Sequence, residues 1–347
     1  MALNKFENAV IHVDAPGMYT TIQDIGRVGG YQQYGMPVAG GPMDSESYLL
    51  GGQALVGNTE PVGGALECTI LPPTLTVKGT CIVAFTGGAD MQPTINNVVV
   101  PRYIPFVCHE GDVISGGFSQ CGGVRMYIAF SGGIDVPEIN GSVSTHTKAK
   151  IGGLEGRQLK AGDEFGIKSL TREAVHVCDY YGEGHNLFNT VLYNRGGREY
   201  HEPLRVVLGE QAKHFTENGI KTFGSKIYTL TVQCDRMGFR LDGPIIEHVD
   251  SADIISDGAV FGSIQVPSDG NPIVLMADRQ TTGGYTKIGT IITADLPRLS
   301  QLPVGDGIHF DIVSIEDAQD IYRTYMKRLH KRMQLAYEQS TYVFKVN

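Results

Sequence analysis

The chain has 347 residues, 41% of them hydrophobic, with a formal net charge of −9 and a pI of about 5.6. This length exceeds what one hydrophobic core usually organises, so two domains are expected. The negative charge argues against a nucleic-acid partner, because phosphate binding needs a clustered positive field.

The expected location is the cytoplasm, without a membrane span. The N-terminal segment lacks the apolar stretch of a secretory signal, and no run of about 18 apolar residues exists. The ten histidines and six cysteines show no metal-ligand spacing and no C-x-x-C pair. This pattern predicts reduced thiols and no metal site.

Most of the chain is typical of β-structure. Short runs of β-branched and aromatic residues alternate with turn residues, and the 45 glycines suit tight turns and bulges. The expected strands are residues 75–79, 81–85, 125–130, 203–209, 227–233, 273–276 and 308–313. Gly-Asp turns precede apolar-containing segments in residues 110–113, 161–164 and 304–307. Such turns are common in β-barrels and suggest two barrel-like halves, although they do not prove a repeat.

Few helices are expected. Residues 42–55 form a candidate with Pro42 near its first turn, and residues 209–218 form a short polar one. The clearest helix begins after Ser314, where Ser314 and Asp317 resemble a capping box. Residues 341–346 are expected to be a strand or an extended tail.

The boundary between the halves is expected near residue 200, in a polar, glycine-rich segment. It gives an N-terminal half of residues 1–200 and a C-terminal half of residues 201–347 that ends in the terminal helix. The basic residues of segment 321–347 fit a solvated helix face, and docking of an acidic partner is the sharper alternative.

Several nucleotide and nucleophile motifs are absent from the sequence. It contains no P-loop, no G-x-G-x-x-G between a strand and a helix, and no G-x-S-x-G elbow. The Met326-Lys327 pair lies in a basic helical context, unlike a biotin-attachment hairpin. No cofactor is therefore expected on this chain, and any ATP or biotin must be bound by partner subunits.

A polar and glycine-rich segment follows the apolar run 273–276. From Asp278 to Tyr285 it is expected to form a loop whose backbone N–H groups face a ligand, with a simple hairpin turn as the alternative. The cluster at residues 234–244 favours a binding site over a turn, because it adds Asp235, Arg236 and Arg240.

Residues 21–27 read T-I-Q-D-I-G-R, and G-M-P and G-P-M-D follow at 35–37 and 41–44. With segments 55–69, 132–142, 234–244 and 262–310, this pattern resembles the carboxyltransferase subdomain family historically called allophanate hydrolase subunit 2. That family includes KipA-type proteins, the C subunit of bacterial 5-oxoprolinase and one half of the carboxyltransferase region of urea carboxylase. The resemblance spans nearly the whole chain.

The resemblance implies a mainly β fold of two cyclophilin-like β-barrel halves with few helices. It implies a KipI-like partner, which is the B subunit in 5-oxoprolinase, and a large subunit that uses ATP to open 5-oxoproline to glutamate. One departure is visible: many members read G-S-R-S-T-D where this chain has G-S-V-S-T-H at residues 141–146.

Lactam opening and carboxyl transfer both build negative charge on a carbonyl oxygen, which preorganised donors must stabilise. Asp24, Arg236 and Gln280 are the catalytic candidates. Arg236 and Arg240 are candidates to bind a substrate carboxylate, or alternatively to pair with Asp235 and Asp242. The other substrate-binding candidates are Gln23, Arg27, Asp235, Gln265, Thr281, Thr282, Gly283, Gly284 and Tyr285.

Asp24 is also a candidate turn cap, because it precedes a glycine by two residues. Met43 and Asp44 are expected to fix a helix start. Glu67 lies between apolar residues, so burial would require a partner, and Arg27 or Arg125 is suggested.

Three functions are compatible with these residues. The first is a subunit of an ATP-dependent 5-oxoprolinase acting on a small lactam. The second is a half-site of a biotin-dependent carboxyltransferase acting on a urea-like substrate. The third is a non-catalytic regulator that binds a KipI-like kinase inhibitor. A carboxylase is normally fused to its biotin domains, so a separate chain favours the first.

Overall fold

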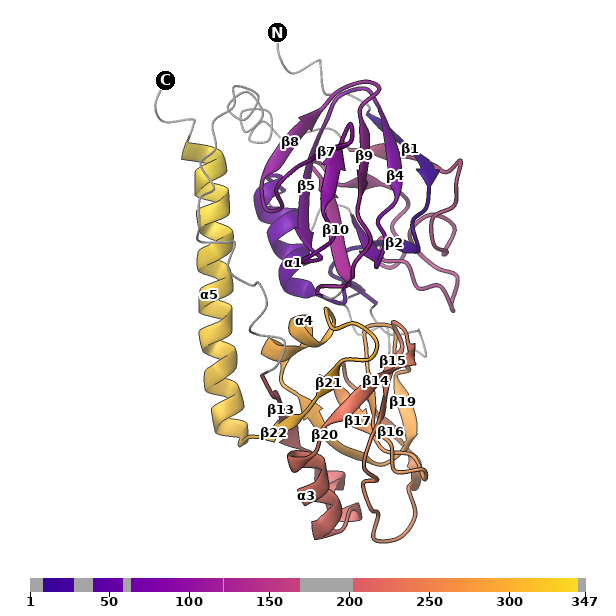
Figure 1. Cartoon of the computed structure of the whole chain (residues 1–347), viewed down its shortest axis with the longest axis vertical. Coiled ribbons are helices and arrows are strands. Elements are labelled where there is room, and N and C mark those ends of the chain that lie inside the picture. Colours follow the sequence, from indigo (N-terminus) through magenta and orange to yellow (C-terminus); the bar gives the residue numbers. More distant parts are fainter. Residues whose placement is uncertain (1–8, 28–39, 59–63, 121, 169–201, 343–347) are drawn as a thin grey trace. The chain divides into compact units, whose positions relative to one another are not determined.

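The computed structural model describes residues 9–27, 40–58, 64–120, 122–168 and 202–342 (Figure 1). Contacts divide the chain into two compact units. Unit 1 comprises Met1–Val28, Gly40–Gly196 and Arg328–Asn347, and unit 2 comprises Gly29–Ala39 and Gly197–Lys327. The end of the C-terminal helix, from Arg328, groups with unit 1, and the division near residue 200 stays a prediction.

The described residues of unit 1 form two antiparallel sheets. Their strands are β1 (Val10–Ala15), β2 (Tyr19–Gln23), β3 (Ala65–Thr69), β4 (Thr74–Lys78), β5 (Cys81–Gly87), β6 (Pro93–Ile95), β7 (Val98–Val99), β8 (Pro105–Cys108), β9 (Val113–Gly116), β10 (Arg125–Phe130), β11 (Ile134–Asp135) and β12 (Glu164–Ile167). One sheet has the order β11-β12-β1-β4-β9-β6-β7, and the other has the order β2-β3-β10-β5-β8.

Strand β10 is buried on both faces, which explains its nearly continuous apolar sequence. Met126, Ile128 and Phe130 enter the core between the two sheets, together with residues of β1, β4 and β5. Tyr127 and Ala129 point the other way, into a second cluster built by the helical segment that follows Asp44. The two faces of one strand therefore join both layers of unit 1.

That helical segment is α1 (Ser45–Leu49) followed by the π-helix η3 (Leu50–Leu55), beside β5 and β10 (Figure 1). Asp44 caps α1 by accepting a hydrogen bond from the Ser47 backbone nitrogen, as predicted. The helix begins at Ser45, three residues after Pro42, because the cap is Asp44. The predicted helix 42–55 is therefore present, but it begins at Ser45 and its second part is a π-helix.

Unit 2 contains a larger sheet and a two-stranded ribbon among its described residues. Its strands are β13 (Leu204–Leu208), β14 (Tyr228–Cys234), β15 (Gly238–Asp242), β16 (Asp253–Gly258), β17 (Ser263–Gln265), β18 (Ile273–Leu275), β19 (Thr282–Tyr285), β20 (Lys287–Ile291), β21 (Gly307–Ile308) and β22 (Phe310–Ile312). The sheet order is β21-β14-β15-β18-β17-β20-β13-β22, and β16 pairs with β19 to form the ribbon. Only His309 separates the two edge strands in sequence, so the sheet is a nearly closed barrel.

The helical segments of unit 2 are short apart from the C-terminal helix. They are η5 (Glu210–His214), α3 (Glu217–Ser225), η6 (Thr293–Asp295), α4 (Leu296–Leu299) and the first part of α5 (Ile315–Tyr342). The predicted Ser314–Asp317 cap is present in a related form, because Ser314 Oγ accepts from the Asp317 nitrogen and donates to the Asp317 carboxylate. Helix α5 runs to Tyr342, so Thr341 and Tyr342 are helical rather than extended, and the rest of that predicted tail lies outside the described residues.

All three predicted Gly-Asp turns are confirmed. Gly111, Gly162 and Gly305 have φ angles of 86°, 87° and 93°, in a region that favours glycine. The aspartates at 112 and 163 accept hydrogen bonds from the backbone nitrogen three residues earlier, each at 2.7 Å. The predicted strands are present too, except that segment 308–313 divides between β21 and β22 at the barrel edges.

Candidate functional site

Arg236 and Asp278 form a buried ion pair in unit 2. Arg236 Nε lies 2.9 Å from Asp278 Oδ2, and Nη2 lies 2.8 Å from Oδ1. The Asp278 backbone nitrogen also donates to the Arg236 carbonyl at 2.7 Å, which ties the β14–β15 turn to the segment after β18. The sequence suggested Asp235 as the alternative partner of Arg236, but the structure has Asp278 in that place.

Asp235 and Arg240 lie on either side of the same turn. Asp235 Oδ1 accepts from the nitrogens of Met237 and Gly238, at 2.7 and 3.1 Å, so this carboxylate caps the turn. Arg240 is exposed on β15, and within the described part of the chain it forms no ion pair with Asp242. Substrate binding by these two residues stays a prediction.

Gln265 is the most enclosed of the predicted binding residues in unit 2. It lies on β17 with its side chain buried, and its Oε1 accepts a hydrogen bond from Gln280 Nε2 at 3.3 Å. Its Nε2 has no acceptor among the residues that the structure describes. A buried amide N–H without a protein partner is unfavourable in a folded protein, so this donor suits a water molecule or a ligand.

A side chain at position 283 would have to displace this amide. A Cβ atom there would lie 2.2 Å from Gln265 Nε2, closer than any real side-chain contact. The neighbouring Gly284 has no such constraint, because its nearest atoms would be 3.7 and 3.9 Å away. Close approach of the Gln265 side chain, rather than a positive φ, is therefore what position 283 demands.

The expected loop after Asp278 is largely a strand. Thr282–Tyr285 is β19, whose Gly283 lies opposite Asp257 of β16, and only residues up to Thr281 precede it as a loop. The prediction was wrong here because it ignored β16, a polar strand whose sequence gives little periodic signal. The Tyr285 ring is partly exposed at 41%, at the end of the ribbon.

Arg279 was not among the predicted site residues, although it lies between Asp278 and Gln280. Its side chain is half-buried, and its Nε donates to the Ala259 carbonyl at 3.2 Å. Burial lowers the pKa of Arg279, and the charge of Asp278 opposes this effect only in second place. The position of Arg279 inside the polar segment 278–285 was the available signal, but sequence alone could not tell which arginine forms no ion pair.

The N-terminal set centres on Asp24 in unit 1. Its Oδ1 accepts from the Gly26 nitrogen and from the hydroxyls of Ser142 and Ser144, at 2.8, 2.6 and 2.7 Å. Its Oδ2 accepts from the Val143 nitrogen at 2.7 Å. The bond to Gly26 is the predicted turn cap, and the other three hold the loop that departs from the family pattern.

Gln23 and Arg27 contact the same loop. Gln23 Nε2 donates to the Thr145 carbonyl at 3.0 Å, and Arg27 Nη2 donates to the Ser144 carbonyl at 2.7 Å. Both side chains are fully buried. The predicted trio of Gln23, Asp24 and Arg27 is thus brought together, and its visible work is to position loop 142–145.

The two residues that depart from the family pattern have local roles in this loop. Val143 packs into the core between the sheets. His146 is buried, and its Nδ1 accepts from the Ala149 nitrogen at 3.2 Å.

Glu67 is buried and has a partner, as its apolar neighbours suggested, but sequence reasoning did not name Tyr127 for this role. The hydroxyl of Tyr127 donates to Glu67 Oε2 at 2.6 Å, and the Met43 nitrogen donates to the same oxygen at 2.8 Å. The Asp44 nitrogen donates to the Tyr127 hydroxyl at 2.9 Å. Burial, followed by the charges of Glu67 and Asp44, raises the pKa of Tyr127. The available signal was the alternation of side chains along β10, which places Tyr127 on the face turned away from the core between the two sheets.

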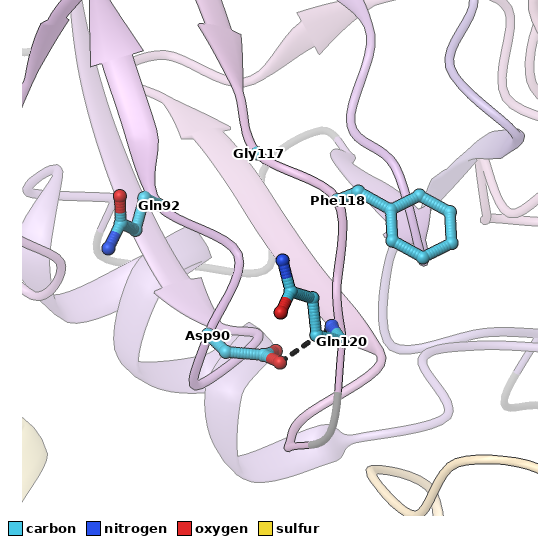
Figure 2. A pocket seen from close by; sticks show the side chains of 5 residues that line it. All are labelled: Asp90, Gln92, Gly117, Phe118 and Gln120. Carbon is cyan, nitrogen blue, oxygen red and sulfur yellow. Dashed lines mark hydrogen bonds between the residues drawn. The ribbon is translucent and has the colours of Figure 1, made fainter.

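A separate cavity of about 330 Å³ opens in unit 1 between the segments after β5 and β9. Figure 2 shows its lining by Asp90, Gln92, Gly117, Phe118 and Gln120. The Asp90 carboxylate is engaged by the segment after β9, since it accepts from the Gln120 nitrogen at 2.7 Å and from the Ser119 hydroxyl at 2.9 Å. None of the predicted site residues is among these five.

Across the described ranges, no group of three or more His, Cys, Asp or Glu side chains is placed to hold a metal ion. In the same ranges, every helix is too short or too polar to cross a membrane.

Comparison with known proteins gives consistent matches. Residues 34–312 match the family described as carboxyltransferase domain, subdomain A and B. The chain is 36% identical to the 5-oxoprolinase C subunit of Escherichia coli K12 over 303 residues, covering 87% of this chain and 91% of that protein. It is 28% identical to urea amidolyase of Saccharomyces cerevisiae, covering 91% of this chain and 17% of that protein.

Solved structures agree with this assignment. The K. lactis urea amidolyase structure superposes with a TM-score of 0.78 at 25% identity, covering 93% of this chain and 20% of that chain. The TTHA0988 structure gives a TM-score of 0.71 at 27% identity, covering 87% of this chain and 55% of that chain. This chain belongs to the carboxyltransferase domain, subdomain A and B, family.

Proposed function

We propose that this chain is a subunit of an ATP-dependent 5-oxoprolinase that opens 5-oxoproline to glutamate. It works with a KipI-like subunit and with a large subunit that binds and uses ATP. The complex belongs in the cytoplasm, where buried thiols such as those of Cys68 and Cys108 stay reduced.

One observation carries this proposal: the chain is 36% identical to the E. coli 5-oxoprolinase C subunit over 91% of that protein. The subunit of the same name from Haemophilus influenzae is 31% identical over a similar share. The urea amidolyase of S. cerevisiae is less similar, at 28%. The 5-oxoprolinase subunits therefore share more of their residues with this chain.

The polar side chains of unit 2 suit the chemistry of a lactam. Opening the ring builds negative charge on the carbonyl oxygen, and fixed N–H donors in a water-poor site stabilise that charge. The unpartnered Nε2 of Gln265 is such a donor, held in place by the bond from Gln280 to its Oε1. ATP on the large subunit supplies the driving force, and the residues of this chain bind and orient the substrate.

The test is reconstitution of the three subunits, followed by glutamate formation from 5-oxoproline with and without ATP. We expect ATP-dependent glutamate that disappears when this chain is omitted. Gln265→Leu should lower kcat by about 100-fold, the effect of losing one donor to a developing oxyanion. Gln233→Leu, an exposed glutamine on β14, is the matched control and should retain activity.

A second candidate is supported by the superposition on K. lactis urea amidolyase. In that function the chain is half of a biotin-dependent carboxyltransferase acting on a urea-like amide. If the reconstituted complex assembles but forms no glutamate, the 5-oxoprolinase proposal fails. Transfer of carboxylate from carboxybiotin to urea would then establish the second candidate, and absence of both activities would favour a regulator of a KipI-like protein.

A further inference from the structure

Arg279 differs from the other enclosed arginines of unit 2. Among the described residues of that unit, Arg205 and Arg298 pair with Asp295, and Arg236 pairs with Asp278. Arg279 is half-buried as well, but among the described residues its side chain forms no ion pair and only one hydrogen bond, from Nε to the Ala259 carbonyl. Its charge is therefore partly removed from water, and Asp278, whose carboxylate is already bound to Arg236, is near it without forming an ion pair with it.

A partly desolvated cation that forms no ion pair is stabilised when an anion binds directly to it. One hydrogen bond also anchors the guanidinium at Nε. Ala259 accepts from Arg279 Nε and donates its own nitrogen to the Thr281 carbonyl at 2.9 Å. This arrangement fixes the stem of Arg279 at the start of β19 and leaves its two terminal nitrogens for a ligand.

The residue next to Arg279 connects it to the unpartnered amide. Gln280 donates to Gln265 Oε1, and Gln265 Nε2 has no acceptor among the described residues. Two neighbouring segments linked by the Gln280–Gln265 hydrogen bond thus carry a cation without an ion pair, at Arg279, and an amide N–H without an acceptor among the described residues, at Gln265 on β17. A small molecule that carries both a carboxylate and an amide carbonyl satisfies both requirements.

We propose that Arg279 binds the carboxylate of the substrate and thereby selects carboxylate-bearing lactams over neutral amides. The inference deepens the proposed function and rests on it. Arg236 is not available for this role, because Asp278 already occupies its Nε and Nη2. The guanidinium of Arg279 can bind a carboxylate through two parallel hydrogen bonds, which a lysine cannot reproduce.

The experiment compares two substrates in the reconstituted complex: 5-oxoproline and 2-pyrrolidinone, the same lactam without its carboxylate. For Arg279→Met we expect kcat/KM for 5-oxoproline to fall by about 10- to 100-fold, the usual effect of losing hydrogen bonds to a charged group. The kcat/KM for 2-pyrrolidinone should not change. Arg279→Lys should recover part of the loss, and Arg323→Met, an exposed arginine on α5, should behave as wild type.

Equal loss on both substrates, or no loss on either, would overturn the inference. Thermal unfolding of each variant separates a folding defect from a binding defect, and the 2-pyrrolidinone rate of a folded variant is an internal reference. If the wild-type complex makes no product from either lactam, the proposed function fails independently of Arg279. Calorimetric titration of 5-oxoproline into the complex then decides the inference, which stands if Arg279→Met abolishes binding seen with wild type and falls otherwise.

Discussion

Arg236 and Asp278, 42 residues apart in the chain, join the β14–β15 turn to the end of β18 through two parallel hydrogen bonds. Both side chains are at most 6% exposed. A buried ion pair of this geometry is held tightly, but removal of one partner leaves the other charge buried and uncompensated, which is unfavourable. The pair therefore has to be considered in any mutational study of unit 2.

Removal of either partner should destabilise unit 2. We expect Arg236→Ala or Asp278→Ala to lower the free energy of unfolding by about 3–5 kcal/mol, since each leaves an uncompensated buried charge. Denaturation in urea measures this change. Arg323→Ala, which breaks an exposed pair with Asp320, should cost less than about 1 kcal/mol. Similar costs for the two arginines would contradict a structural role for the buried pair.

The two adjacent glycines of β19 should differ in their tolerance of a methyl group. Gly283→Ala places Cβ 2.2 Å from Gln265 Nε2 and must displace that amide, so we expect kcat/KM to fall by about 10-fold or more. Gly284→Ala meets nothing closer than 3.7 Å and should leave activity near wild type. Steady-state assays of the reconstituted complex make the comparison. Equal effects at both positions would show that the Gln265 contact is unimportant.

Asp24→Asn should loosen loop 142–145. The amide offers one acceptor atom where the carboxylate offers two, so the Val143 nitrogen or the two hydroxyls lose their partner. We expect a loss of about 1–3 kcal/mol in unfolding free energy. Asp14→Asn, at an exposed position of β1, is the control. If Asp24 also acts as an acid or base, as predicted, kcat of Asp24→Asn should fall strongly even at temperatures where the variant is fully folded.

His248 should make stability depend on pH. Burial lowers the pKa of His248 below the usual 6.5. The hydrogen bond to the Val266 carbonyl opposes this shift, and repulsion from His214 adds to it. The unfolded chain therefore binds the proton more readily than the folded one. Its contribution to stability is complete above pH 6.5 and is lost as pH falls through the lower pKa of the folded state.

Replacement of His248 by glutamine should flatten this dependence. Urea unfolding at pH 8 and at pH 5 gives the two free energies for each protein. We expect wild type to lose more stability between these pH values than His248→Gln does, whereas His330→Gln, at an exposed position of α5, should follow wild type. An unchanged slope in His248→Gln would assign the acid sensitivity to other groups.

Local patterns predicted most of the strands and the start of α5. Runs of alternate or consecutive apolar residues predicted β4, β5, β10 and β14 near their observed positions. The Ser314–Asp317 cap joins residues only three positions apart. These features depend on neighbours in the chain, so sequence contains the required information.

Features that depend on contacts between residues distant in the chain were harder to predict from the sequence. The strand β19 exists because β16 pairs with it, and β16 is polar and almost fully exposed. The carboxylate of Asp278 pairs with Arg236 rather than with Arg279, its neighbour in sequence, because the β14–β15 turn brings Arg236 to it. The candidate residues could be named from their types, but which of them lacks a partner is a property of the folded chain.

The contribution of α5 to unit 1 also sets an order for folding during synthesis. Ala336 is completely buried in the cluster formed by Tyr48, Tyr127 and their neighbours. The roughly 200 residues between Phe130 and Ala336 take on the order of 10 to 40 seconds to translate. For that period the outer face of η3 and β10 lacks its cover on the ribosome. Nascent chains of this protein should therefore engage holding chaperones until translation passes α5.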